Sequence, residues 1–135
     1  PNVSDIASIA LAAESGGATS IALINSLFGM AIDYKTGKSR IKKGIGGYTG
    51  IGIKPIALAL TYKAAQAVKI PILAMGGIYD WKDALEFIWA GASAVAIGTA
   101  NFINPLAAPE LIMGLAEHLL KEDKSIQDLI GACRS

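Results

Sequence analysis

Cysteine is almost missing from the chain, since Cys133 is the only one among 135 residues. A single cysteine excludes a disulfide framework and a cysteine-rich zinc or iron–sulfur site within these residues. An excess of charge of one sign is also lacking, because twelve basic side chains are balanced by eleven acidic ones. Such a balance gives no basic footprint for nucleic acid or an anionic membrane surface. We therefore expect no metal site and no nucleic-acid partner, and a reducing, cytoplasmic setting fits the lone cysteine.

Apolar runs suited to a membrane are missing as well. The longest stretch without a charged residue lies between Glu86 and Glu110 and is long enough to cross a bilayer. Its second half carries turn-forming and polar residues, such as Asn101, Asn104 and Pro105, at a density that a membrane helix does not have. We therefore predict no membrane-spanning segment.

Hydrophobic residues, in contrast, make up 53% of the chain, which is enough apolar material for a buried core. They form two patterns in alternation. Helical spacing predicts helices over residues 4–14, 55–68, 81–89, 109–121 and 125–132, with Ser4, Asp80 and Ser125 as N-caps. Uninterrupted apolar runs predict strands over residues 19–24, 71–75 and 93–97. Strands of this kind, each preceded by a helix, are typical of a parallel sheet covered by helices, so we predict an α/β fold.

Two of these helix–strand units repeat each other. Gly76-Gly77 follows one strand and Gly98-Thr99 follows the next, 22 residues further on, which suits one unit of a (β/α)8 barrel. Three strands, or four if another precedes Pro1, cannot close an eight-stranded barrel. We therefore expect residues 1–135 to be about half of a TIM barrel, with an apolar face and two strand edges left uncovered.

The glycines that follow these strands predict a phosphate site. Ligands of parallel α/β barrels bind at the carboxyl ends of the strands. Glycine lets backbone N–H groups approach a phosphate, the Thr99 hydroxyl adds a donor, and a short helix from Ala100 would point its N-terminus at the same anion. A bulky residue at Gly77 is then expected to exclude the phosphate and leave the helices intact. The alternative is that these glycines only terminate the strands and bind no ligand. Two glycine-containing pairs after neighbouring strands favour the phosphate site over this alternative.

A long Gly-rich and Lys-rich stretch, residues 25–53, separates the first strand from the next helix. Asn25 and Ser26 begin it, at the same mouth as the glycine pairs. An amide beside a hydroxyl can hydrogen-bond a flat heterocycle or a carboxylate, and a turn or cap role is an equal alternative. The glycines at residues 44–52 do not have dinucleotide-binding spacing, and residues 34–39 (YKTGKS) are predicted to form a hairpin tip.

Four other side chains are given structural roles. His118 lies on the polar side of its predicted helix and is expected to be solvated. Trp81 and Trp89 are expected to pack. Cys133 is expected to be a buried small residue in the last helix and not a nucleophile, since no histidine is near it in sequence.

Five stretches of the chain, with the Pro105 that follows the last, resemble the catalytic subunits of the dihydroorotate dehydrogenase family. The form that uses FMN and a separate electron-transfer subunit is the most similar. The stretches are PNVSDI, INSLFGMAID, GGYTGIGIKPIAL, IPILAMGGI and LEFIWAGASAVAIGTANF. They cover nearly the whole chain, and the resemblance implies that residues 1–135 are the carboxyl-terminal half of one FMN-binding (β/α)8 barrel domain.

The resemblance also implies an activity and a site: oxidation of dihydroorotate to orotate, in pyrimidine biosynthesis, with FMN taking the hydride. The residues implied to bind FMN are Ile24, Gly50, Gly76, Gly77, Gly98 and Thr99, the last four at its phosphate. Those implied to bind the dihydroorotate or orotate ring are Asn25 and Ser26. The family often has threonine where Ser26 stands, and leucine-serine where Tyr48-Thr49 stand.

By the same resemblance, no catalytic residue lies in this chain. The family's proton-abstracting cysteine and a flavin-contacting lysine lie upstream of the position of Pro1, and Cys133 does not match the former. The chain alone is therefore expected to be inactive and the complete barrel active. The implied partners are the amino-terminal half of the barrel, a second catalytic subunit in a homodimer, and an electron-transfer subunit with FAD and an iron–sulfur cluster.

Two other functions stay open on the sequence. One is the pyrimidine-reducing branch of the FMN barrels, similar to dihydropyrimidine dehydrogenase, which shares the glycine arrangement. The other is a non-catalytic, phosphate-binding half-barrel that works by self-assembly. The final electron acceptor is not determined by these residues.

Overall fold

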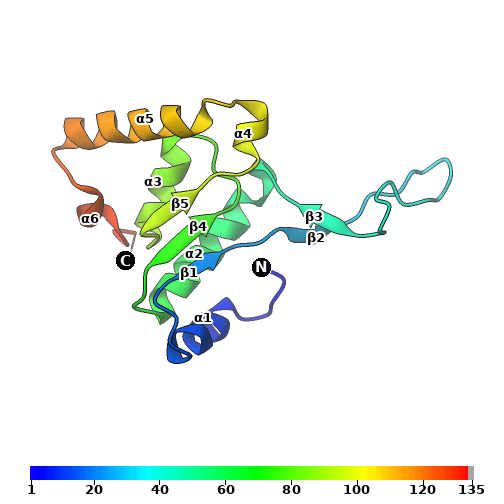
Figure 1. Cartoon of the computed structure of the whole chain (residues 1–135), viewed down its shortest axis with the longest axis horizontal. Coiled ribbons are helices and arrows are strands. Elements are labelled where there is room, and N and C mark those ends of the chain that lie inside the picture. Colours follow the sequence, from blue (N-terminus) through cyan, green and yellow to red (C-terminus); the bar gives the residue numbers. More distant parts are fainter. Residues whose placement is uncertain (134–135) are drawn as a thin grey trace.

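A three-stranded parallel sheet forms the centre of the structure, a computed structural model that describes residues 1–133 (Figure 1). Its strands are β1 (Ile21–Leu23), β4 (Ile72–Met75) and β5 (Ala94–Ala96), and β4 lies between the other two. Both strand pairs are parallel. The three apolar runs therefore form strands as predicted, each a little shorter than its run.

Six helices surround or follow the sheet in the described part of the chain. They are α1 (Ile6–Ser15), α2 (Lys54–Ala67), α3 (Trp81–Trp89), α4 (Ala100–Ile103), α5 (Ala107–Glu122) and α6 (Ile126–Leu129). Asp80 and Ser125 cap α3 and α6 as predicted, each in a capping box. The prediction for Ser4 is wrong, because the Asp5 side chain accepts the N–H of Ala7 and caps α1 instead.

The two faces of the sheet differ in what covers them. On one face, Ile72 and Ala74 of β4 pack in the core with Ala57 and Ala64 of α2 and with Phe87 of α3, all at most 2% exposed. Alanine at these α2 positions lets the helix approach the sheet closely. The opposite face carries a row of three residues in register across the strands, Ala22, Leu73 and Ala94, and all three are exposed. One uncovered face is what part of an open barrel presents.

The long stretch between the first two parallel strands forms a hairpin arm that extends away from the sheet (Figure 1). Its strands are β2 (Leu27–Gly29) and β3 (Gly46–Tyr48), which pair antiparallel. Further out, Ile32 and Ser39 form a bridge, and the Asp33 N–H donates to the Lys38 carbonyl at 2.9 Å. The hairpin tip predicted for residues 34–39 is confirmed. A 3-10 turn, η1 (Ile51–Ile53), then leads into α2.

The prediction of a buried Cys133 is wrong, and His118 is less exposed than expected. Cys133 is exposed: α6 already ends at Leu129, and although the Gly131 and Cys133 N–H groups donate to the carbonyls of Ile88 and Trp89 at the end of α3, the Cys133 side chain is not covered. His118 is only partly exposed, since α5 crosses α3 and the imidazole stacks on the Trp81 ring with 5.0 Å between ring centroids. Trp81 packs against the core as expected, whereas Trp89 is 39% exposed.

Neither a membrane-spanning helix nor a metal-binding cluster is found within residues 1–133. No helix within residues 1–133 is both long and apolar enough to cross a membrane. In the same range, no cluster of three histidine, cysteine, aspartate or glutamate side chains is placed to hold a metal ion.

Candidate functional site

A cavity of about 480 Å³ lies at the carboxyl ends of the parallel strands. The segments that leave β1, β4 and β5 line it with residues 24–26, 76–79 and 97–99. Residues 49, 50 and 53, between the hairpin arm and α2, also line it, as do Ala22, Met75 and Ala96 of the strands themselves. A volume of this size suits a small molecule or a cofactor.

All eight residues that the sequence marked for binding line this one cavity. They are Ile24, Asn25, Ser26, Gly50, Gly76, Gly77, Gly98 and Thr99. They come from four segments that lie far apart in the sequence. Seven of them converge because parallel strands end at the same edge of the sheet, and Gly50 joins them because the hairpin arm returns to that edge.

The fold itself requires glycine at positions 76 and 77, whether or not a ligand binds there. Both have positive φ, +128° and +77°, which disfavours any side chain. A Cβ on Gly76 would lie 2.8 Å from the Cβ of Ala57, and one on Gly77 would lie 2.7 Å from the backbone nitrogen of Lys54. The expectation that a bulky residue at Gly77 leaves the helices intact therefore does not fit this packing, because the start of α2 would have to move.

Gly98 is different. Its φ is not in the positive range, and no atom lies within 4 Å of the position that a Cβ would take. The described part of the fold would thus accept a side chain there, and the glycine leaves open space beside the cavity. Next to it, the Thr99 hydroxyl donates to the Thr49 hydroxyl at 3.3 Å, which joins the segment after β5 to the base of the hairpin arm.

Asn25 makes the local turn contact that is one of the two roles left open by the sequence. Its Oδ1 accepts the backbone N–H of Ser26 at 2.7 Å, which is a local turn contact. Its Nδ2 has no hydrogen-bond partner among the described residues, although the side chain lies at the cavity wall. The amide oxygen is therefore used by the fold, whereas the amide N–H₂ is not.

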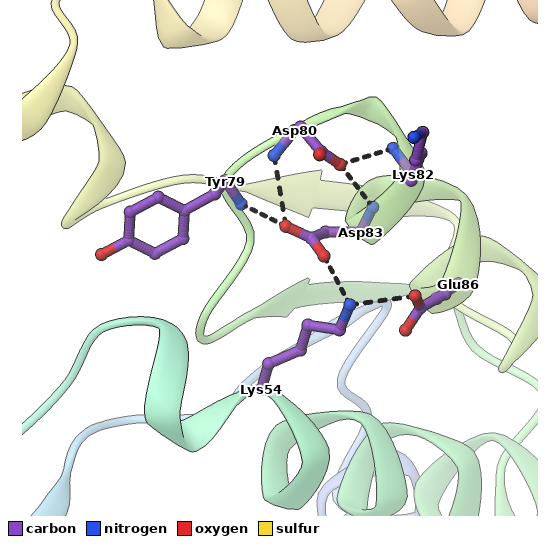
Figure 2. A network of polar contacts seen from close by, with 6 residues as sticks. All are labelled: Lys54, Tyr79, Asp80, Lys82, Asp83 and Glu86. Carbon is purple, nitrogen blue, oxygen red and sulfur yellow. Dashed lines mark hydrogen bonds and ion pairs between the residues drawn. The ribbon is translucent and has the colours of Figure 1, made fainter.

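Tyr79 also lines the cavity and was not among the predicted residues. Its hydroxyl lies 3.6 Å from the position of a Cβ on Gly50, so the side chain reaches from the segment after β4 to the opposite wall. Figure 2 shows the ring directed away from the polar network that holds its backbone. The sequence feature that could have identified Tyr79 as a cavity residue is its position two residues after Gly77, in the same segment that follows β4.

A partly buried ion pair lies directly behind the segment at residues 76–79 (Figure 2). Lys54, the first residue of α2, donates from Nζ to Asp83 Oδ1 at 2.5 Å and to Glu86 Oε1 at 2.9 Å. Burial disfavours the ionised form of Asp83, but the Lys54 ammonium and the Tyr79 and Asp80 N–H groups outweigh it and lower the pKa of Asp83. Burial likewise opposes the charge on Lys54, and the two carboxylates outweigh it and raise the pKa of Lys54.

The family model described as dihydroorotate dehydrogenase matches residues 1–119. The chain belongs to the dihydroorotate dehydrogenase family. This family has the TIM-barrel fold, and the parallel sheet with helices on one face is consistent with part of such a barrel, so the predicted fold class is confirmed.

Curated members of the dihydroorotate dehydrogenase family are similar over almost the whole chain. A protein of Lachnoclostridium phytofermentans is 52% identical over 135 residues, 99% of this chain and 45% of its own length. Proteins of Alkaliphilus metalliredigens and Bacteroides fragilis are 53% and 49% identical over 96% and 98% of this chain, and over 42% and 44% of their own lengths. Each is named dihydroorotate dehydrogenase B (NAD(+)), catalytic subunit. The chain thus spans less than half the length of these relatives.

Tyr48, which was expected to depart further from the family resemblance than Ser26, does not line the cavity. Its side chain is half exposed, and its ring lies against Gly52, with Cζ 3.3 Å from the position of a Cβ there. Ser26, the milder departure, does line the cavity and presents a hydroxyl as threonine would. Neither departure removes a polar group from the site.

Lys54→Met is expected to lower the free energy of unfolding by roughly 1–3 kcal/mol between about pH 5 and pH 9, because the buried Asp83 carboxylate loses its cation. Since folding lowers the pKa of Asp83, its contribution is present above about pH 4 and is lost as the pH falls through the folded-state pKa. Since folding raises the pKa of Lys54, its contribution is complete below about pH 10 and is lost above it. Denaturant unfolding of both proteins at several pH values measures this. A difference between them that stays constant down to about pH 2 would contradict it.

Proposed function

We propose that this chain forms the FMN- and pyrimidine-binding part of a dihydroorotate dehydrogenase, which oxidises dihydroorotate to orotate in cytoplasmic pyrimidine biosynthesis. The observation that carries the proposal is the convergence of all eight predicted binding residues on one cavity, at the barrel end where ligands bind. Membership of the family and the names of the relatives support the same activity.

The residues at the cavity fit FMN. Gly98 leaves a space that a Cβ would fill, and the Thr99 hydroxyl beside it can donate to a phosphate oxygen. Gly76 and Gly77 add backbone N–H groups at the end of the neighbouring strand, while Ile24 and Gly50 would contact the flavin ring. When bound, FMN supplies the acceptor for the hydride that leaves dihydroorotate.

The substrate ring would lie at Asn25 and Ser26, where an unpaired amide N–H₂ and a hydroxyl adjoin the cavity. The residues that line the cavity include no cysteine, histidine, aspartate or glutamate. Dehydrogenation also needs a base for the second proton. We therefore assign that base to the rest of the barrel, and residues 1–135 to cofactor and substrate binding.

The remaining barrel strands are the first partner we propose, because they would cover the exposed row Ala22, Leu73 and Ala94. Residues 1–135 would then be the carboxyl-terminal half of the domain. The relatives are named as catalytic subunits, which supports a further subunit that takes electrons from the flavin. We infer a homodimer of catalytic subunits with an electron-transfer subunit that carries FAD and an iron–sulfur cluster.

The proposal is tested by adding dihydroorotate anaerobically to the purified complete protein and following the absorbance of its flavin. Reduction of bound FMN with formation of orotate is expected. Reduction by dihydrouracil but not by dihydroorotate would move the protein to the pyrimidine-reducing branch. A complete protein that binds inorganic phosphate but no flavin would replace the enzyme with a phosphate-binding module.

Asn25→Ala in the complete protein is expected to leave FMN bound and to lower kcat/KM for dihydroorotate. One lost hydrogen bond to the substrate corresponds to roughly threefold to more than a hundredfold, depending on the charge of its partner. The loss of the Asn25–Ser26 turn contact should also lower Tm slightly. Steady-state kinetics normalised to bound flavin measure the effect. Normal kinetics with a lowered Tm would return Asn25 to a purely structural role.

A further inference from the structure

A carboxylate that does not line the cavity accepts hydrogen bonds from the backbone at the end of the cavity segment after β4, residues 76–79 (Figure 2). Asp83 Oδ2 accepts the backbone N–H of Tyr79 at 2.8 Å and that of Asp80 at 3.2 Å. Asp83 is 8% exposed, and its other oxygen accepts the Lys54 ammonium. The carboxylate therefore fixes the far end of the segment through its backbone and leaves the Tyr79 side chain free for the cavity.

Lys54 touches the same segment at its near end. The backbone N and Cα of Lys54 lie 2.7 and 2.8 Å from the position of a Cβ on Gly77, so the two backbones are in contact. Lys54 also directly follows η1, and Gly50 before that turn and Ile53 at its end line another wall of the cavity. Lys54 is thus joined to the wall at residues 50–53 through the chain at Ile53. It contacts the segment at residues 76–79 by its backbone at Gly77 and by its ammonium through Asp83.

The ion pair is suited to hold these walls at a fixed spacing. The side chains of Lys54 and Asp83 are 23% and 11% exposed, so solvent screens their attraction less than it would at the surface. The second partner of Lys54, Glu86, is 39% exposed and receives no backbone N–H from the segment. Asp83 alone connects the ammonium to the cavity segment.

We propose that the Lys54–Asp83 ion pair positions the segment at residues 76–79 against the wall at residues 50–53, and thereby sets the affinity of the cavity for the phosphate end of its ligand. Both are positioning residues that act through Tyr79, Asp80 and Gly77. The inference rests on the proposed function, because it takes FMN as the ligand. A spacing error of about an ångström is enough to weaken several hydrogen bonds at once.

The test uses the complete protein without flavin, and two variants, Asp83→Asn and Lys54→Met. Quenching of flavin fluorescence gives Kd for FMN and for riboflavin, which has the same ring and no phosphate. We expect Kd for FMN to rise by about tenfold or more in each variant, and Kd for riboflavin to change by less than about threefold. Glu86→Gln is the matched control, because it removes a partner of the same ammonium. It should leave both values within about twofold of the unchanged protein.

The outcomes separate this inference from the proposed function. If the unchanged protein binds FMN and both variants bind it equally well, with only a lower Tm, the ion pair is structural and the inference is wrong. An equal loss for FMN and riboflavin also overturns it, because the phosphate end would not be singled out. If the unchanged protein binds no FMN, the proposed function fails and the inference falls with it. Should Asp83→Asn fail to fold, Lys54→Met alone decides.

Discussion

Gly98→Val is expected to abolish retention of FMN by the complete protein while leaving its stability nearly unchanged. The open space at the Gly98 Cβ position means that the described fold itself does not clash with the new side chain. The isopropyl group would instead occupy the space proposed for the phosphate and keep its oxygens away from the Thr99 hydroxyl. Loss of several charge-assisted hydrogen bonds together corresponds to a rise in Kd of about a hundredfold or more.

Flavin absorbance per protein after gel filtration measures retention, and a thermal melt of the flavin-free protein measures stability. Gly98→Ala should give an intermediate loss, since it adds a single methyl group. Ala116→Val, at an exposed position of α5, adds valine away from the cavity and should retain FMN fully. A yellow Gly98→Val protein with full flavin occupancy would contradict the phosphate site.

Gly77→Ala is expected to destabilise the fold itself, by roughly 2–5 kcal/mol, and to lose FMN as a consequence. Two costs add up at this position. The positive φ of +77° is unfavourable for any residue with a Cβ. The methyl group would also lie within 2.8 Å of the Lys54 backbone, which cannot turn aside as the end of a flexible side chain can.

Gly17→Ala separates these two costs. Gly17 also has a positive φ, +92°, but no atom lies within 4 Å of its Cβ position. It should therefore show the conformational cost alone, about 1–2 kcal/mol. Denaturant unfolding of the flavin-free proteins gives both values. Equal losses at the two sites would mean that the contact between Gly77 and Lys54 does not constrain the fold.

Much of the fold could be predicted because its signals are local. Apolar runs of strand length gave β1, β4 and β5, and capping residues gave the starts of α3 and α6. Strands β2 and β3 were not predicted, because their glycine-rich residues form strands only through the pairing between them. The exposure of Cys133 and the stacking of His118 on Trp81 likewise depend on how distant segments meet.

The sequence by itself indicated the α/β class and predicted that the glycine pairs and Asn25-Ser26 lie together, because strand ends in a parallel sheet must meet at one edge. The family, and Ile24 and Gly50 as further candidates, followed from the resemblance alone. Only the tertiary structure separated the glycines, since the neighbours of a Cβ belong to segments distant in sequence. Gly76 and Gly77 are required by their contacts with α2, whereas Gly98 lies in open space. The tertiary structure also revealed Asp83 behind the cavity, because its partners Lys54 and Tyr79 come from separate elements that packing alone brings together.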